Sequence, residues 1–141
     1  MNSVGIDVSK GRSTVAVMRP FGEVVISPFE VRHTNSELSA LARLLKSLDG
    51  ETRVVMEATG NYHTPVAKVL HDARLYVSVV HAKLIHSYGN NDLRRVKTDR
   101  KDAVKPANYG LNRWLTLPRY FPGGRYPALT EKLLPPVQSV F

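Results

Sequence analysis

The 141-residue sequence contains no cysteine, which excludes disulfide bonds and thiolate metal sites. It also has no run of about 18 apolar residues, and its N-terminus lacks a basic region followed by an apolar one. We therefore expect neither a membrane span nor a secretory signal, and we expect a cytoplasmic location.

Two further kinds of site are missing from the sequence. The segment "SKGRS" (9–13) lacks the second glycine that a phosphate-binding loop requires before Lys-Ser or Lys-Thr. His33, His71 and His86 have no acidic or histidine partners at ligand spacing, so zinc is not expected. The composition is otherwise that of a globular protein, with 43% hydrophobic and 23% charged residues, and the length fits one domain.

Positive charge is in excess and is unevenly distributed. The net charge is +8, from 20 Lys and Arg against 12 Asp and Glu. Residues 1–88 hold 10 cations and 8 anions, whereas residues 89–141 hold 10 cations and 4 anions. A basic half favours partners rich in phosphate, because each neutralised phosphate releases a counterion.

Hydrophobic periodicity predicts an α/β fold with element order β-β-β-α-β-α-β-α. A meander followed by alternating helices and strands indicates a mixed sheet covered by helices. Pro28 would place the third strand at an edge or a bulge. A capping box at Thr34 and Glu37 begins the first helix, which Gly50 closes. Thr64 is the expected cap of the second helix. The expected strands cover 3–9, 13–19, 23–32, 52–58 and 75–81, and the expected helices cover 35–49, 64–73, 82–88 and a segment starting at Thr98 or Asp99.

The C-terminal part differs in composition. Residues 117–141 carry five of the nine prolines and two adjacent glycines, without a sustained period. This pattern is typical of irregular or disordered chain. We therefore expect a folded domain over 1–113 and an irregular tail over 114–141.

Four carboxylates stand where the expected elements could bring them together. Asp7 lies within the apolar first strand, where a carboxylate is costly unless it is paired or bound to a cation. Glu57 ends the fourth strand, and Asp99 and Asp102 share one helix face through their three-residue spacing. Oxygen ligands of this kind suit Mg²⁺ or Mn²⁺. The alternative is that the two aspartates are first-turn acids favoured by the helix dipole, and that Glu57 is solvated.

Cations surround the last two carboxylates in "VKTDRKDA" (96–103). They would attract a nucleic-acid backbone while the acids hold divalent cations that act on a phosphodiester. The candidate nucleic-acid-binding residues are Lys10, Arg94, Arg95, Lys97, Arg100, Lys101 and Lys105.

Three segments in this order and spacing, "VGIDVSK", "VVMEATGNYH" and "VKTDRKDA", resemble the N-terminal domain of DEDD transposases of bacterial insertion sequences, the Piv-like invertase family. The resemblance covers about residues 3–112. It implies a RuvC-like, ribonuclease H-like fold and a catalytic, metal-binding tetrad of Asp7, Glu57, Asp99 and Asp102 with Mg²⁺. It also implies DNA binding, DNA recombination during transposition, a structured guide RNA and a homo-oligomer.

The sequence departs from the family pattern in two places. No serine matches the nucleophile of the family's C-terminal domain, so we expect a truncated copy with weak or no complete strand transfer. Pro106 would bend or stop a helix that carries Asp99 and Asp102, because it removes a hydrogen bond to the Asp102 carbonyl.

Three functions stay open from the sequence. The first is a transposase of this family, and the second is a RuvC-like structure-selective nuclease, which needs no serine. The third is a non-catalytic module that binds nucleic acid through the basic segment 94–105. An actin-like ATPase or sugar kinase is disfavoured, because it requires glycine-rich phosphate turns repeated in a second domain.

Overall fold

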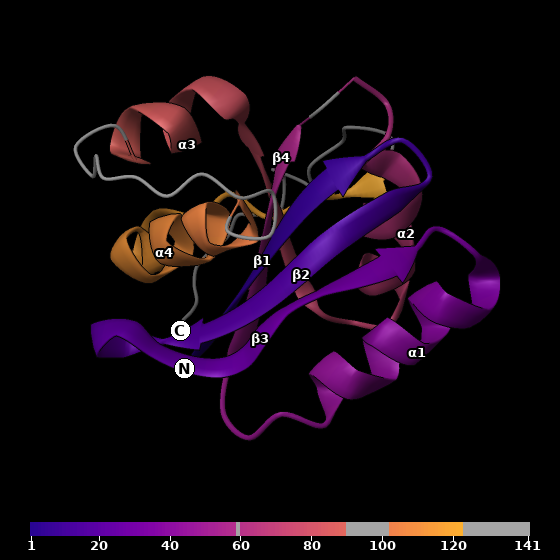
Figure 1. Cartoon of the computed structure of the whole chain (residues 1–141), viewed down its shortest axis with the longest axis horizontal. Helices are drawn as coiled ribbons and strands as arrows, with labels where there is room; N and C mark the ends of the chain where they lie inside the picture. Colours follow the sequence, from indigo (N-terminus) through magenta and orange to yellow (C-terminus); the bar gives the residue numbers. More distant parts are fainter. Residues whose placement is uncertain (59, 90–101, 123–141) are drawn as a thin grey trace, which may run out of the picture.

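The computed structural model of the protein describes residues 1–58, 60–89 and 102–122 (Figure 1). Five strands and four α-helices make up this part of the chain, with two short 3₁₀ turns. The strands are β1 (Asn2–Ser9), β2 (Arg12–Arg19), β3 (Glu23–Arg32), β4 (Thr52–Ala58) and β5 (Tyr76–His81). The helices are α1 (Asn35–Lys46), α2 (Thr64–Asp72), α3 (Ala82–Gly89) and α4 (Val104–Asn112), and the 3₁₀ turns are η1 (Pro20–Gly22) and η3 (Trp114–Thr116).

The strands form one mixed sheet in the order β3-β2-β1-β4-β5. β1, β2 and β3 pair antiparallel as a meander, whereas β1–β4 and β4–β5 pair parallel. The mixed sheet predicted from the sequence is confirmed, and the structure makes the first and fourth strands neighbours. The carboxyl ends of β1, β4 and β5 consequently share one edge of the sheet.

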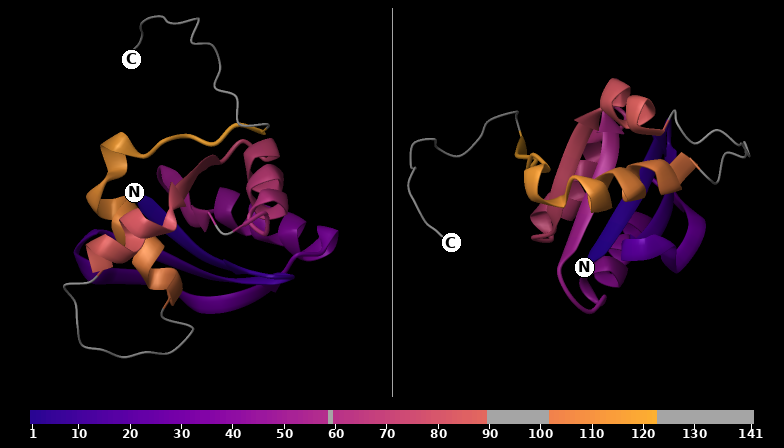
Figure 2. Two further views of the ribbon diagram at one scale, coloured as in Figure 1. Left: turned by 90° about the horizontal axis from the view of Figure 1, so that it is seen from above. Right: turned by 90° about the vertical axis from the view of Figure 1, so that its left-hand side faces the viewer.

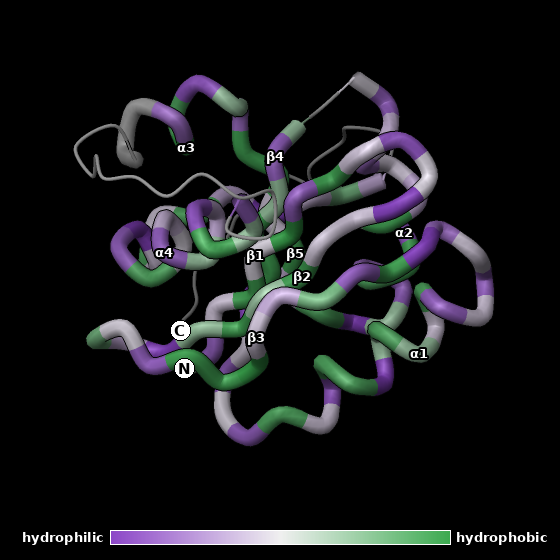
Figure 3. Tube along the Cα trace, in the orientation of Figure 1, coloured by the Kyte–Doolittle hydropathy of each residue, from purple (hydrophilic) through white to green (hydrophobic). Residues whose placement is uncertain are grey.

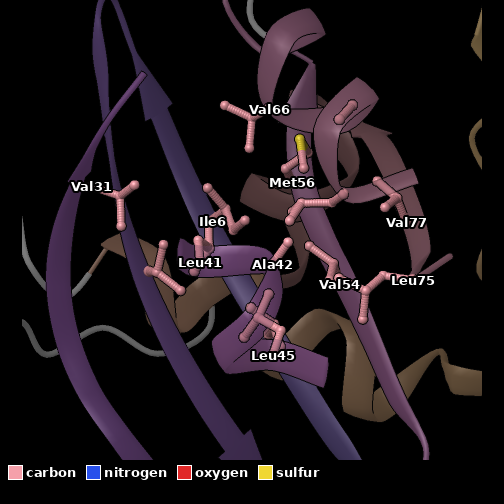
Figure 4. Close-up of a cluster of buried hydrophobic side chains, with 14 of the residues drawn as sticks. Ile6, Val31, Leu41, Ala42, Leu45, Val54, Met56, Val66, Leu75 and Val77 are labelled. Carbon is pink, nitrogen blue, oxygen red and sulfur yellow. The ribbon is translucent and has the colours of Figure 1, made fainter. Parts of the chain in front are cut away.

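Helices cover both faces of the sheet, as two views show (Figure 2). On one face, α1 and α2 pack on the large core, which includes Leu70 and, labelled in Figure 4, Ile6, Leu45 and Met56, all at 0–1% exposure. Each such side chain contributes about 1.5–3 kcal/mol on burial. On the other face, α3 and α4 cover a smaller apolar cluster: Val55, Val80, Ile85, Tyr109 and Leu117. Hydrophobic segments concentrate along the central strands (Figure 3).

The boundaries of α1 follow its capping residues. Thr34 Oγ1 accepts a hydrogen bond from Glu37 N at 3.2 Å, as the capping box predicts. The Glu37 carboxylate, however, accepts from Arg32 N at 2.8 Å and so fastens the helix to the end of β3. The helix ends at Lys46 with Ser47 as C-cap, four residues before the predicted stop at Gly50.

Prolines are accommodated where their missing N–H costs little. Pro28 lies in β3, which is an edge strand with register shifts opposite Val15–Met18, as predicted. Pro65 is in the first turn of α2, but the N-cap is His63 instead of the predicted Thr64. Pro106 is the third residue of α4, where no intrahelical partner for an N–H exists. The predicted bend is therefore unnecessary, because α4 begins at Val104. The predicted start at Thr98 or Asp99 lies outside the described residues.

The first residues of the expected tail pack on the sheet. Leu117 is 4% exposed, the Tyr76 hydroxyl donates to the Leu117 carbonyl at 2.7 Å, and Tyr120 N donates to the Val77 carbonyl at 2.7 Å. Residues 117–121 thus run beside β5, although they form no regular strand. The expected boundary at residue 113 stays a prediction. Among the helices described, none has the length and apolar character that crossing a membrane requires.

Candidate active site

Asp7 and Glu57 lie on the same face of the sheet, near its carboxyl-end edge. The parallel pairing of β1 and β4 runs up to Ile6 opposite Met56, one residue before each acid. Ile6 and Met56 belong to the large core, so alternation turns the next residue of each strand towards the face that α3 and α4 cover. We call this edge, with Asp7 and Glu57, the carboxylate edge. It unites two acids that the sequence separates by 50 residues.

Glu57 contacts a histidine that the sequence did not associate with it. The side chain of Glu57 is 23% exposed, and its Oε2 lies 3.4 Å from Nε2 of His86 on α3. His86 has no acidic partner at ligand spacing along the chain, so motif spacing could not have found this pair. Only the packing of α3 beside β4 brings the two residues together.

α4 sits directly on the backbone of β1. A Cβ added to Gly5 would lie 2.1 Å from the Ala103 carbonyl oxygen and 2.5 Å from Ala107 N, so only glycine admits the helix at this depth. Ser3 Oγ donates to the Ala107 carbonyl at 2.6 Å. Further along, Gly110 lies against Ser3 and Val55. The helix start is therefore fixed above Gly5.

Asp102 immediately precedes this contact, because Ala103 is its neighbour and the N-cap of α4. Asp7 lies two residues beyond Gly5 on the same face of β1, about 7 Å along the strand. Asp102 is exposed and precedes α4, so it does not lie on that helix as the sequence predicted. Two of the predicted site residues, Asp7 and Glu57, thus lie at the carboxylate edge, and Asp102 precedes the helix that is seated on β1.

The fourth acid, Asp99, lies outside the described residues. Within the part of the chain that the structure describes, no three His, Asp or Glu side chains are grouped closely enough to hold a metal ion. The donor set still fits one kind of ion. Mg²⁺ usually keeps several waters and binds through one or two carboxylates together with substrate phosphates. Asp7 and Glu57 on adjacent parallel strands match this requirement.

Two of the predicted nucleic-acid-binding cations are described, and both are near the carboxylate edge. Lys10 is exposed in the turn after β1, and Lys105 is exposed in the first turn of α4. The other five are outside the described residues: Arg94, Arg95, Lys97, Arg100 and Lys101.

A second histidine lies in the loop that follows β4. His63 caps α2, and burial lowers its pKa below the ordinary value of 6.5. Its Nδ1 is buried without a hydrogen-bond partner among the described residues. Burial likewise lowers the pKa of His33, whose Nε2 is 2.7 Å from Ser13 Oγ. Both imidazoles are thus biased towards the neutral form.

Comparison with known proteins identifies the family. A model of the DEDD transposase family, described as "Transposase", matches residues 4–129. Among solved structures, Thermus thermophilus RuvC has a TM-score of 0.54 at 13% identity and covers 85% of this chain and 100% of its own. T. thermophilus RuvC in complex with a Holliday junction substrate has a TM-score of 0.58 at 11% identity, covering 85% and 99%. No curated protein matches the sequence. The RuvC likeness shows the ribonuclease H-like fold, and the family match shows that this chain belongs to the DEDD transposases.

Proposed function

We propose that this chain binds DNA and contributes the metal-binding carboxylates to phosphodiester cleavage in transposition. The observation that carries the proposal is the β1–β4 register, which sets Asp7 and Glu57 side by side on one face of the sheet. Asp102, which precedes α4, and Asp99 in the segment before it would complete the set.

The proposed ligands of Mg²⁺ or Mn²⁺ are Asp7, Glu57, Asp99 and Asp102. When bound, the ions supply Lewis-acid stabilisation of charge on the reacting phosphate oxygens. These carboxylates would hold the cations, because strand register positions the backbones of Asp7 and Glu57 and the Gly5 contact fixes the helix that follows Asp102. Lys10 and Lys105 neutralise the flanking phosphates and so orient the DNA backbone.

A cation-binding measurement tests the site independently of catalysis. We expect about 10 mM Mg²⁺ to raise the Tm of the chain, since a ligand at ten times its Kd stabilises by about 1.4 kcal/mol. Asp7→Asn should remove this increase, and Asp49→Asn, an exposed aspartate before β4, should keep it. An equal increase in both variants would contradict the proposed ligand set.

A structure-selective nuclease is the second candidate. It is favoured because the match covers 100% of the chain of T. thermophilus RuvC, a protein that is also solved with a Holliday junction substrate. Incubation with branched DNA and Mg²⁺ distinguishes the two functions: a nuclease yields only cut strands, whereas a recombinase also yields rejoined ones. Salt-sensitive binding that persists without all four acids, and without any product, would indicate a binding module alone.

The proposal extends to two further partners from the family resemblance. A structured guide RNA would select the DNA, and a homo-oligomer would assemble on it. Measurement of the particle mass with and without RNA tests both expectations, because each partner adds a defined mass increment.

A further inference from the structure

A second polar feature lies at the opposite edge of the sheet from the carboxylates. It is a hollow of about 260 Å³ at the amino ends of β4 and β5, which we call the amino-end hollow. Its lining residues come from the end of α1, the loops that enter both strands and the segment after η3: Leu45, Lys46, Leu48, Gly50, Glu51, Thr52, Arg74, Leu75, Tyr76 and Arg119.

The charge of the amino-end hollow is strongly positive. Lys46, Arg74 and Arg119 are exposed cations, and Glu51 is the one carboxylate among the lining residues. Glu51 Oε2 is already paired with Arg53 Nη2 at 2.9 Å. The three exposed cations therefore face solvent together, in an arrangement that favours an anion with several negative charges.

Arg74 occupies a backbone position at which glycine is the usual residue. It follows the C-cap Ala73 of α2, has φ of +70°, and donates its N–H to the His71 carbonyl at 2.8 Å. Helices commonly end with glycine in this left-handed conformation, because a Cβ is disfavoured there. An arginine at this position destabilises the backbone relative to glycine, but it places a guanidinium at the rim of the hollow.

Arg119 is oriented by contacts of the chain around it. Its guanidinium lies 4.9 Å from the centre of the Tyr76 ring, and the Tyr76 hydroxyl holds the Leu117 carbonyl. Tyr120 N donates a hydrogen bond to the Val77 carbonyl. Arg119 therefore lies between Leu117 and Tyr120, two residues whose backbones are hydrogen-bonded to β5. The irregular segment after η3 thereby presents a cation at a defined place.

A deeper arginine supports this arrangement without belonging to the binding surface. Arg53 has a side chain only 16% exposed and lies 4.3 Å from the Tyr76 ring and 4.8 Å from the Trp114 ring. It also donates to the Trp114 carbonyl at 2.5 Å. Because Arg53 fixes Tyr76 from one side, Arg119 stacks on a ring that is already held.

We propose that the amino-end hollow binds backbone phosphates of the nucleic acid on which the protein acts, as a contact separate from the carboxylate edge. The inference rests on the proposed function for the identity of the polymer. β4 separates the two places by five residues from Thr52 to Glu57, which is about 17 Å and exceeds the Debye length of about 8 Å at physiological salt. The hollow thus adds affinity and orientation without altering the acids electrostatically.

The decisive variant is Arg74→Gly, because it removes a cation while relieving the backbone. Binding of a fluorescent duplex of about 30 base pairs is measured from 50 to 300 mM salt. We expect the slope of log K against log[salt] to fall by about 1, and affinity at 0.1 M salt to fall about eightfold. The Tm should be unchanged or higher, which excludes misfolding as the cause.

Matched variants complete the test. Lys46→Gln with Arg119→Gln should lower the slope by about 2, whereas Lys68→Gln, an exposed lysine on α2, should lower neither slope nor affinity appreciably. Unchanged duplex binding in Arg74→Gly and in the double variant overturns this inference alone. The inference is also overturned if these variants bind polyglutamate more weakly than the unmodified chain does but bind the duplex equally well. That result would indicate an acidic protein partner. No duplex binding by the unmodified chain overturns the proposed function as well.

Discussion

The two ends of β4 carry opposite charges on one face of the same strand, and the two charged side chains differ in their contacts and exposure. Arg53 at the amino end is held by Glu51, by the Trp114 carbonyl and by two aromatic rings. Glu57 at the carboxyl end contacts His86, whose side chain is 55% exposed. Arg53 is thus part of the packed structure, whereas Glu57 lies at a more open edge where a ligand can reach it.

The difference shows how the fold assigns roles to similar residue types. At the carboxylate edge, Asp7 and Glu57 come together through strand register. At the amino-end hollow, Lys46, Arg74 and Arg119 line one cavity, and Arg119 also contacts the Tyr76 ring. α4 spans the two regions, since Asp102 precedes it and Trp114 follows it. Four experiments test whether the two ends of β4 differ in function and in stability.

The largest effect is expected at the carboxylate edge. Asp7→Asn should reduce Mg²⁺-dependent DNA cleavage about a thousandfold, which corresponds to about 4 kcal/mol of lost transition-state stabilisation. Duplex binding in the absence of metal should persist, since the cations are untouched. Glu30→Gln on the exposed side of β3 is the control. Full cleavage by Asp7→Asn would remove the functional distinction between the two ends.

The seat of α4 can be disrupted in two graded ways. In Gly5→Ala the new Cβ meets backbone atoms that cannot yield, so the free energy of unfolding should fall by about 3 kcal/mol. In Gly110→Ala the Cβ meets the buried side chains of Ser3 and Val55, which can shift more than backbone, and helix propensity offsets part of the cost, so a smaller loss of about 1–2 kcal/mol is expected. Urea denaturation measures the unfolding free energy of both variants. Equal losses would contradict the claim that α4 packs directly on the backbone at Gly5.

Arg53→Leu tests whether the amino end is structural. It removes an ion pair, a hydrogen bond and two cation–π contacts in a side chain that is mostly buried, so we expect a loss of about 2 kcal/mol in unfolding free energy. Arg12→Leu is matched, because Arg12 is 64% exposed and pairs with Glu30 at 3.6 Å. It should change stability by less than about 0.5 kcal/mol. Similar losses of stability in both variants would contradict a structural role for the contacts of Arg53 with Tyr76 and Trp114.

The smallest effect concerns pH and His63, in the loop that follows β4. Burial lowers the pKa of His63 in the folded chain, so the unfolded chain binds the proton more readily. The corresponding stability is fully present above pH 6.5 and is lost as the pH falls through the lowered folded pKa. Urea midpoints at pH 7.5 and 5.5 should therefore differ less in His63→Gln than in the unmodified chain. An identical difference would show that His63 does not contribute.

Much of this architecture follows from sequence patterns, because they express local physics. Period-two alternation and the Thr34 cap predicted strands and a first helix close to those observed. The alignment of Asp7 with Glu57 could be anticipated from their places on two buried strands. The features that the sequence could not predict are contacts between distant segments: the His86–Glu57 pair, the close packing of α4 on Gly5, and the contact of Arg53 with the Tyr76 ring. Residue spacing along the chain gives no sign of these contacts.

Because β1 pairs antiparallel with β2 on one side and parallel with β4 on the other, its two borders differ in how much chain must be ordered to form them. The turn between β1 and β2 closes within a few residues, whereas the β1–β4 border closes a loop of about 50 residues at a higher entropic cost. We therefore expect the meander to assemble early and the acidic pair to come together late. A newly made chain would then hold its hairpins before it acquires any capacity for chemistry.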